Sequence, residues 1–89
     1  DEFDVDSKKS ERQEDGSIVV DARMDWEDFN DEYGNMIPEG DYESVGGYII
    51  SQLGRIPNKG EHLFMPFGQM VIIKASTRQI HQVKIYPPE

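Results

Sequence analysis

Apolar and polar residues alternate near the front of the chain and again in its last third, as they do in β-strands. In "GSIVVDA", residues 16–22, the alternation places Ile18, Val20 and Ala22 on one face and predicts a short strand. Three more strands are expected later in the chain. They are the short "EHLFM" (residues 61–65), "QMVIIKA" (residues 69–75), which is apolar on both faces as a central strand would be, and "QIHQVKIY" (residues 79–86).

Between these strands, the spacing of apolar residues becomes that of a helix. Trp26, Phe29 and Tyr33 recur at intervals of three and four residues and form one apolar stripe. Asp25 is placed to cap the start of this helix, and Gly34 is placed to end it. A first short helix is therefore expected directly after the first strand.

A second helix is expected in "VGGYIISQLGRIPNKGE", residues 45–61. Either Asp41 or Ser44 is placed to act as its N-cap. Gly54 is expected to end it, and Pro57 forbids its continuation. The residues expected on its buried face are Val45, Ile49, Leu53 and Ile56.

The element order β-α-α-β-β-β predicts a small α+β domain in which two helices pack on a mainly antiparallel sheet. This domain is expected to cover residues 16–86, with a tail at residues 87–89. The segment before it, residues 1–15, is rich in charge and is expected to be an acidic flexible linker. The alternative is that its two large apolar residues, Phe3 and Val5, dock on a neighbouring domain.

Composition excludes some classes of partner. Nine basic residues against eighteen acidic ones give a net charge of −9, which opposes binding to nucleic acid or to an anionic membrane surface. The chain has no cysteine, which fits a reducing cytoplasm, and no run near the roughly 20 apolar residues of a spanning helix. Because it starts at Asp1 without a methionine, we expect it to be a fragment of a longer protein.

The glycine pair at the front of the second helix needs an explanation, because each glycine there costs roughly 0.5–1 kcal/mol relative to alanine. Close packing of the helix start on another part of the protein is the favoured interpretation. The alternative is a small ligand or nucleotide, such as a flavin or an adenine nucleotide, near Gly46, Gly47 and Arg55. The dinucleotide and phosphate-loop patterns are both absent from the sequence.

Candidates for metal binding and catalysis are few. The carboxylates crowded on the first helix, Asp25, Asp28, Asp31 and Glu32, are weak candidates for a hard cation such as Mg²⁺ or Ca²⁺. His62 and His81 could share a transition metal only if strand pairing brought them together. No cysteine exists and no serine lies in a recognisable nucleophile motif, so we expect no catalytic residues, no cofactor and no enzyme.

Several motifs together resemble a known family. They are "DGSIVVDARMDWEDFND", "IPEGDYESVGGYIISQLGRIPNKGE" and the closing "QIHQVKIY", which span about residues 15–86. This arrangement is similar to the transporter-associated domain of the CorC/HlyC type. Its most specific part is the run "DYESVGG", residues 41–47, followed by "LGRIP" and Gly60.

The resemblance implies a C-terminal module of a bacterial membrane protein, one known as hemolysin-like or as a magnesium and cobalt efflux protein. A transmembrane region and a pair of CBS domains precede the module in such proteins, and it is thought to modulate ion transport from the cytoplasmic face of the inner membrane. The fold implied resembles part of a p-cresol methylhydroxylase-type FAD-binding domain, without transfer of the flavin site.

On this interpretation the partners are the CBS domains and transmembrane region of the same parent chain, with a homodimer as a further possibility and no nucleic acid. Exposed apolar residues are the candidate contacts. They are Phe64, Met65, Phe67 and Tyr86.

Overall fold

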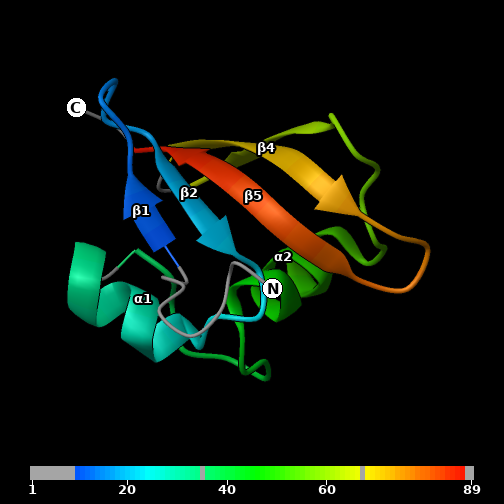
Figure 1. Cartoon of the computed structure of the whole chain (residues 1–89). Helices are drawn as coiled ribbons and strands as arrows, with labels where there is room; N and C mark the ends of the chain where they lie inside the picture. The colour runs from blue at the N-terminus through cyan, green and yellow to red at the C-terminus, as the bar shows by residue number, and fades with distance from the viewer. Residues whose placement is uncertain (1–9, 35, 67, 88–89) are drawn as a thin grey trace, which may run out of the picture.

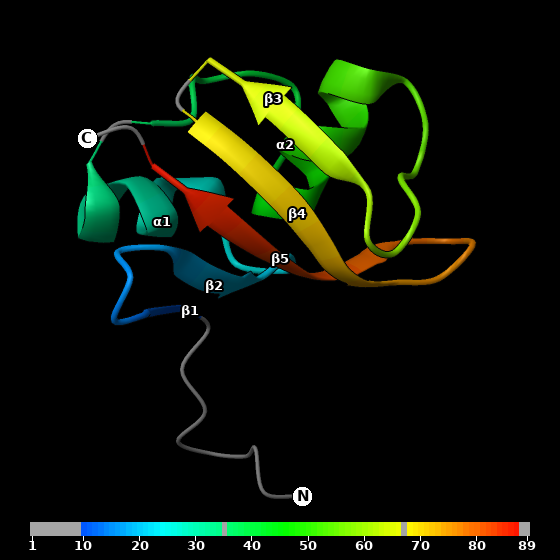
Figure 2. The same cartoon turned by 90° about the horizontal axis from the view of Figure 1, so that it is seen from above.

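The computed structural model describes residues 10–34, 36–66 and 68–87. These residues form a five-stranded sheet in the order β1-β2-β5-β4-β3, and every neighbouring pair of strands is antiparallel. Both helices lie on the same side of this sheet (Figures 1 and 2). The elements are β1 (Ser10–Arg12), β2 (Ile18–Asp21), α1 (Trp26–Tyr33), α2 (Val45–Leu53), β3 (His62–Met65), β4 (Gly68–Ala75) and β5 (Ile80–Tyr86).

The predicted α+β class and the order from β2 to β5 are confirmed, but strand β1 was not expected. It lies inside the segment assigned to a flexible linker, so that assignment is wrong for Ser10–Arg12. Ser10 is buried, and its hydroxyl accepts a hydrogen bond from the Tyr33 hydroxyl at 2.7 Å, while the Arg12 guanidinium lies 5.5 Å from the centre of the Tyr33 ring. These contacts hold β1 on α1 without a large apolar residue. Phe3 and Val5 lie outside the described residues.

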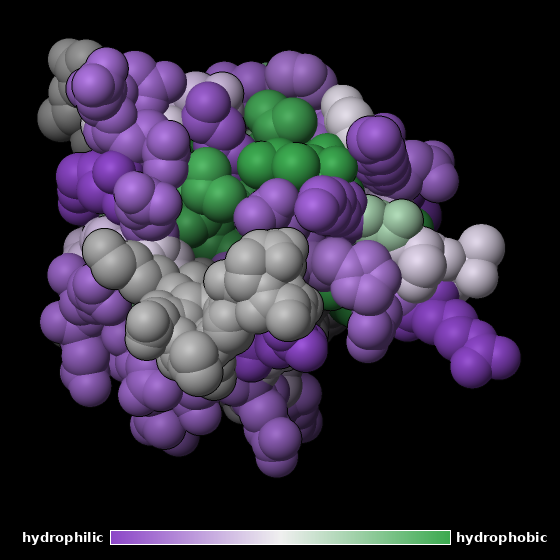
Figure 3. All heavy atoms as spheres, viewed as in Figure 1, coloured by the Kyte–Doolittle hydropathy of each residue, from purple (hydrophilic) through white to green (hydrophobic). Residues whose placement is uncertain are grey.

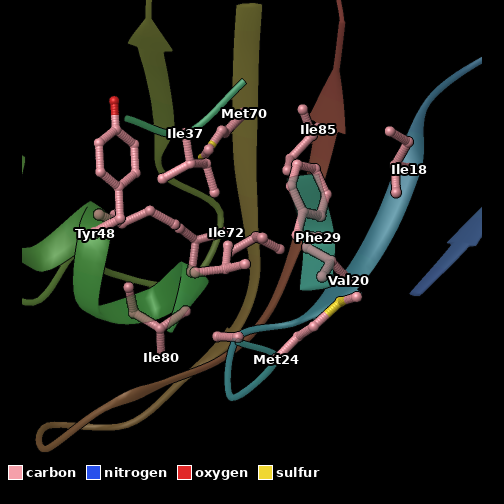
Figure 4. Close-up of a cluster of buried hydrophobic side chains, with 14 of the residues drawn as sticks. Ile18, Val20, Met24, Phe29, Ile37, Tyr48, Met70, Ile72, Ile80 and Ile85 are labelled. Atoms are coloured by element: carbon pink, nitrogen blue, oxygen red, sulfur yellow. The ribbon is translucent and has the colours of Figure 1, made fainter. Parts of the chain in front are cut away.

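The core lies between one face of the sheet and the two helices. Phe29 of α1 and Tyr48 and Ile49 of α2 are at most 1% exposed, and Figure 4 shows side chains of the strands directed toward those of the helices. The strand residues that supply this face are Ile18, Val20, Leu63, Met70, Ile72, Ile80, Val83 and Ile85. Alternate residues on the strands therefore point to the opposite face, which no described helix covers (Figure 2).

Local signals set the helix ends as predicted. Asp25 caps α1 by accepting the amide of Glu27, and Ser44, one of the two candidates, caps α2 by accepting the amide of Gly47. Gly54 ends α2 in the left-handed conformation, with φ of 75°, which a glycine adopts without strain.

The connection from α1 to α2 is organised by a buried polar side chain, that of Asn30. Its amide nitrogen donates to the carbonyl oxygen of Ile37 at 2.7 Å. Its amide oxygen accepts the backbone amides of Met36 at 3.1 Å and of Ile37 at 3.0 Å. Asn30 therefore replaces the regular backbone pairing that this loop lacks, and it fixes the buried side chain of Ile37 in the core.

Candidate functional site: the start of α2 and the helix-free sheet face

The start of α2 packs directly on the end of β2. A methyl group added at Gly46 would lie 3.0 Å from the Ala22 Cβ atom and 3.1 Å from the Ala22 carbonyl oxygen. One added at Gly47 would lie 3.2 Å from Tyr42 Cβ and 3.3 Å from Ser44 Oγ. Protein atoms therefore occupy the space that the missing side chains leave, as the favoured interpretation of the glycine pair requires.

The amide groups that could attract an anion at this helix start are already engaged. The amide of Val45 donates to Met24 O at 2.9 Å, that of Gly46 to Ala22 O at 2.8 Å, and that of Gly47 to the Ser44 hydroxyl at 3.0 Å. An anion would have to displace these protein acceptors. The geometry therefore does not support the alternative nucleotide site at Gly46 and Gly47.

Arg55, the third residue of that alternative, is paired within its own loop. Its guanidinium forms a two-point ion pair with Glu61, and the Nη1 to Oε1 distance is 3.0 Å. The same Glu61 carboxylate accepts the backbone amide of Asn58 at 2.9 Å. "RIPNKGE" is thus a loop closed by its first and last residues. Sequence reasoning treated the arginine alone and missed Glu61 as its partner.

This pairing makes a prediction for the pH dependence of stability. Arg55, followed by the Asn58 amide, lowers the pKa of Glu61 from its ordinary 4.5 to about 2. A carboxyl group with a lowered pKa stabilises the fold above its unfolded pKa and loses that contribution as the pH falls toward its folded pKa. Wild type is therefore expected to be more stable than Arg55→Gln at pH 6. This difference in the free energy of unfolding should shrink as the pH falls from 4.5 to 2.

Urea unfolding at a series of pH values would measure this difference. Arg78→Gln is the matched control, because Arg78 is also exposed but lies in the β4–β5 turn, away from Glu61. A wild-type to Arg55→Gln difference that stays constant down to pH 2 would contradict the assignment.

The carboxylates proposed as weak metal candidates are not gathered into a site. Asp25, Asp28, Asp31 and Glu32 are all exposed, and Asp25 is used as the cap of α1. Among residues 10–34, 36–66 and 68–87, no three His, Cys, Asp or Glu side chains are grouped so that they could hold a metal ion.

The two histidines also lie apart. His62 is on β3, where its Nδ1 is 3.3 Å from the Gln69 side-chain nitrogen. His81 is on β5, where its Nδ1 is 3.5 Å from the side-chain nitrogen of Gln79. Strand β4 runs between β3 and β5, so strand pairing does not bring the two rings together.

The candidate contact residues fall on different surfaces. Phe64 is 80% exposed and Tyr86 is 38% exposed, and both point away from the helices. Met65 is partly buried and packs against the core, and Phe67 lies outside the described residues. Of the four, Phe64 and Tyr86 are thus the exposed ones.

Sequence reasoning missed further apolar residues on the same side of the sheet. Val19, Val71 and Ile73 are partly exposed there, and Figure 3 shows apolar side chains over the strands, bordered by hydrophilic ones. An alternating strand offered a signal for Val19. For Val71 and Ile73 there was none, because β4 is apolar on both faces.

Lys84 lies in the middle of this face. Its amine is 3.9 Å from a carboxylate oxygen of Asp15 and 5.4 Å from the centre of the Tyr86 ring. Hydrogen bonds from Ser17, helped by the charge of Lys84, lower the pKa of Asp15. Asp15 therefore stays ionised near neutral pH and holds the lysine amine toward the edge of the face.

None of the helices in the described part of the chain is both long enough and apolar enough to cross a membrane.

Comparison with known proteins places these features in a family. Residues 11–89 match the model of the CorC_HlyC transporter associated domain. Over 86 residues the chain is 30% identical to Hemolysin C of Brachyspira hyodysenteriae, covering 96% of this chain and 32% of that protein. Over 88 residues it is 27% identical to the magnesium and cobalt efflux protein CorC of Salmonella typhimurium, covering 99% of this chain and 29% of that one.

A third relative is the inner membrane protein YfjD of Escherichia coli, which is 29% identical over 75 residues, or 84% of this chain and 18% of YfjD. The chain therefore spans a third or less of the length of each of these relatives.

Solved structures share the fold. The transporter associated domain of Nitrosomonas europaea superposes with a TM-score of 0.80 at 21% identity, covering 92% of this chain and 99% of that one. A Xylella fastidiosa hemolysin domain in complex with Mg++ and Mn++ gives 0.76 at 24% identity, and the domain of a CBS domain protein from Porphyromonas gingivalis gives 0.78 at 16%. Each of these two comparisons covers 92% of this chain and all of the other.

The family match over residues 11–89 leads to one assignment: this chain belongs to the CorC_HlyC transporter associated domain family.

Proposed function

We propose that the chain is a non-catalytic regulatory module of a bacterial membrane protein that moves Mg²⁺, Co²⁺ or a similar ion. The observation that carries this proposal is that the alignments cover almost all of this chain but a much smaller share of each relative. Nearly all of this chain aligns with Hemolysin C and CorC, but it fills only about a third of either protein. A module that recurs inside longer transport-related chains acts through the parts attached to it.

The chemistry of the described residues supports a role without catalysis. The polar groups that could have served a ligand stabilise the fold instead: Arg55 is paired with Glu61, and the first amides of α2 are donated to Met24, Ala22 and Ser44. The most exposed large apolar side chain, Phe64, suits contact with another protein surface.

The partners we propose are the CBS domains and the transmembrane region of the parent chain, with the module on the cytoplasmic face of the inner membrane. Two relatives support this arrangement by their descriptions, since YfjD is an inner membrane protein and the Porphyromonas domain comes from a CBS domain protein. Regulation would require that the module make different contacts in two states of the transporter.

Deletion in the intact parent tests the proposal. Cells that express the parent without residues 10–87 are expected to retain the protein in the membrane but to show an altered rate of Mg²⁺ or Co²⁺ efflux after loading. Substituting exposed Gln52 with Lys in the full parent is the control, which should leave efflux unchanged. Equal efflux with and without the module, at equal membrane abundance, would contradict a regulatory role.

Calorimetric titration separates the nucleotide alternative from the proposed role. FAD, AMP and ATP, each with and without Mg²⁺, are expected to give no saturable heat with the isolated chain. Tight binding that is lost in Arg55→Gln would favour the alternative instead.

A further inference from the structure

The side of the sheet that faces away from α1 and α2 has a regular arrangement of side chains, and we call it the free face. Its members follow from strand alternation, because their neighbours point into the core. One row of paired residues crosses all five strands, and it contains His62, Val71, Lys84, Val19 and Glu11. A second row contains Phe64, Gln69 and Tyr86, and a third contains Lys74, Gln82 and Asp21.

Charge divides the free face into two halves. Glu11 and Asp21 lie on β1 and β2, and Asp21 is already paired with Arg23 at 2.9 Å, so Glu11 is, among the described residues, the unpaired carboxylate of that half; His62 and Lys74 lie on β3 and β4. Strand β5 lies between the halves, and it is the middle strand of the sheet order β1-β2-β5-β4-β3. A twofold axis along β5 would therefore lay Glu11 and Asp21 of one copy over His62 and Lys74 of another.

We propose that two copies of this domain associate through their free faces about a twofold axis parallel to β5. Such an axis places β2 over β4 of the partner. Each cross-strand row then lies opposite the same row of the second copy, running in the reverse direction. Val19 then meets the partner's Val71, and Glu11 meets the partner's His62. Aligned sheets cross at about 30°, so pairs one strand from the axis lie closest to being directly opposite, and pairs two strands from it are offset further along the strands.

The acidic helical layer favours this arrangement over a dimer formed through the helices. Every charged residue between Met24 and Gly54 is a carboxylate, and all of them are exposed on α1 or on the connection to α2. They are Asp25, Glu27, Asp28, Asp31, Glu32, Glu39, Asp41 and Glu43. Pairing through the free faces leaves these carboxylates on the two outer surfaces, beyond the roughly 8 Å over which charges interact at physiological salt.

The size of the free face predicts a weak dimer. Five strands at roughly 4.8 Å spacing and about five residues of length give roughly 400 Å² per copy, or roughly 800 Å² in total, which is below the roughly 1,000 Å² of an ordinary specific interface. In a parent that holds two modules close together, effective concentrations near the millimolar range would populate such a dimer. The inference deepens the proposed function, on which it rests, by naming a second copy as one partner of the module.

Lys84 opposes the association, because the proposed axis brings it opposite the partner's Lys84. Its amine is drawn aside by Asp15 and Tyr86, which reduces this repulsion without removing it. Removing the charge should therefore strengthen the dimer, whereas adding a charge elsewhere on the free face should weaken it. The two substitutions have opposite expected signs.

Sedimentation equilibrium between 10 µM and 1 mM tests the proposal. Wild type is expected to form a dimer over this range, Val71→Lys to weaken it at least tenfold, and Lys84→Met to strengthen it severalfold. Gln52→Lys adds the same charge to the helical layer and should leave the dimer intact. Phe64→Ser removes an 80% exposed side chain, so its weaker dimer could not be attributed to unfolding.

A charge exchange identifies the partner surface. His62→Glu places a carboxylate opposite the partner's Glu11 and should weaken the dimer, and adding Glu11→Lys should restore it. A monomer at 1 mM, or a dimer unaffected by Val71→Lys and Phe64→Ser, would overturn the inference. If the isolated domain is monomeric but its deletion still alters efflux, the dimer proposal fails and the regulatory role stands.

Discussion

Gly46→Ala is expected to destabilise the domain by about 1–2 kcal/mol, although helix propensity alone predicts a gain of up to about 1 kcal/mol. The new methyl group would lie 3.0 Å from Ala22 Cβ and 3.1 Å from the Ala22 carbonyl oxygen, and this oxygen is fixed by the amide of Gly46 itself. Because the neighbour is backbone, it cannot rotate away. Urea unfolding of wild type and Gly46→Ala measures whether the substitution lowers the free energy of unfolding, as close packing predicts, or raises it, as helix propensity predicts.

Two further variants serve as controls for this prediction. Gly47→Ala meets the side-chain atoms Tyr42 Cβ and Ser44 Oγ at 3.2 and 3.3 Å, so its loss should be smaller than that of Gly46→Ala. Adding Ala22→Gly to Gly46→Ala removes the contact between the two methyl groups but keeps the contact with the carbonyl oxygen, so partial rescue is expected. A stabilised Gly46→Ala domain would mean that the start of α2 is not closely packed.

Asn30→Ala is expected to lower the free energy of unfolding by about 3 kcal/mol. Asn30 is 9% exposed and makes all three of its hydrogen bonds to the backbone of Met36 and Ile37. Truncation leaves the Ile37 amide and carbonyl without the side chain that pairs them, whereas the Met36 amide keeps its bond to the Gly34 carbonyl oxygen at 2.8 Å. Ile37, which is 2% exposed, would lose its fixed place in the core.

Asn58→Ala is the matched control, because Asn58 is exposed and bonds Glu61 through its backbone: its amide donates to the Glu61 carboxylate and its carbonyl oxygen accepts the Glu61 amide. Its stability should stay within about 0.5 kcal/mol of wild type. Hydrogen exchange gives a second readout, since loss of the Asn30 side chain should accelerate exchange of the Met36 and Ile37 amides. Unchanged exchange at both amides would show that the loop does not depend on Asn30.

Local patterns were sufficient to predict the parts of the fold that depend on neighbouring residues. Asp25 and Ser44 cap their helices because a short polar side chain precedes an amphipathic run, and Gly54 ends α2 for an equally local reason. The alternation of Ile18 and Val20 gave the buried face of β2 correctly. These features need no knowledge of what lies across the domain.

Features that depend on distant residues could not be predicted in the same way. Strand β1 forms because it pairs with β2 and because Ser10 is hydrogen-bonded to Tyr33. Nothing within its own three residues indicates a strand. Asn30 acts seven residues away from Ile37, through a loop with no periodic signal. The free face was missed because an apolar run such as β4 does not indicate which of its two faces a helix will cover.

The docking of β1 has a mechanical consequence for whatever the module is attached to. The strand is three residues long, has β2 as its neighbour, and lies at the sheet edge where the chain enters at Ser10. Detaching this strand would lengthen the extended chain in front of β2 by roughly 10 Å and would leave the other four strands paired. Tension on the chain at Ser10 would therefore have to break the hydrogen bond between the Tyr33 and Ser10 hydroxyls before it reached the rest of the sheet.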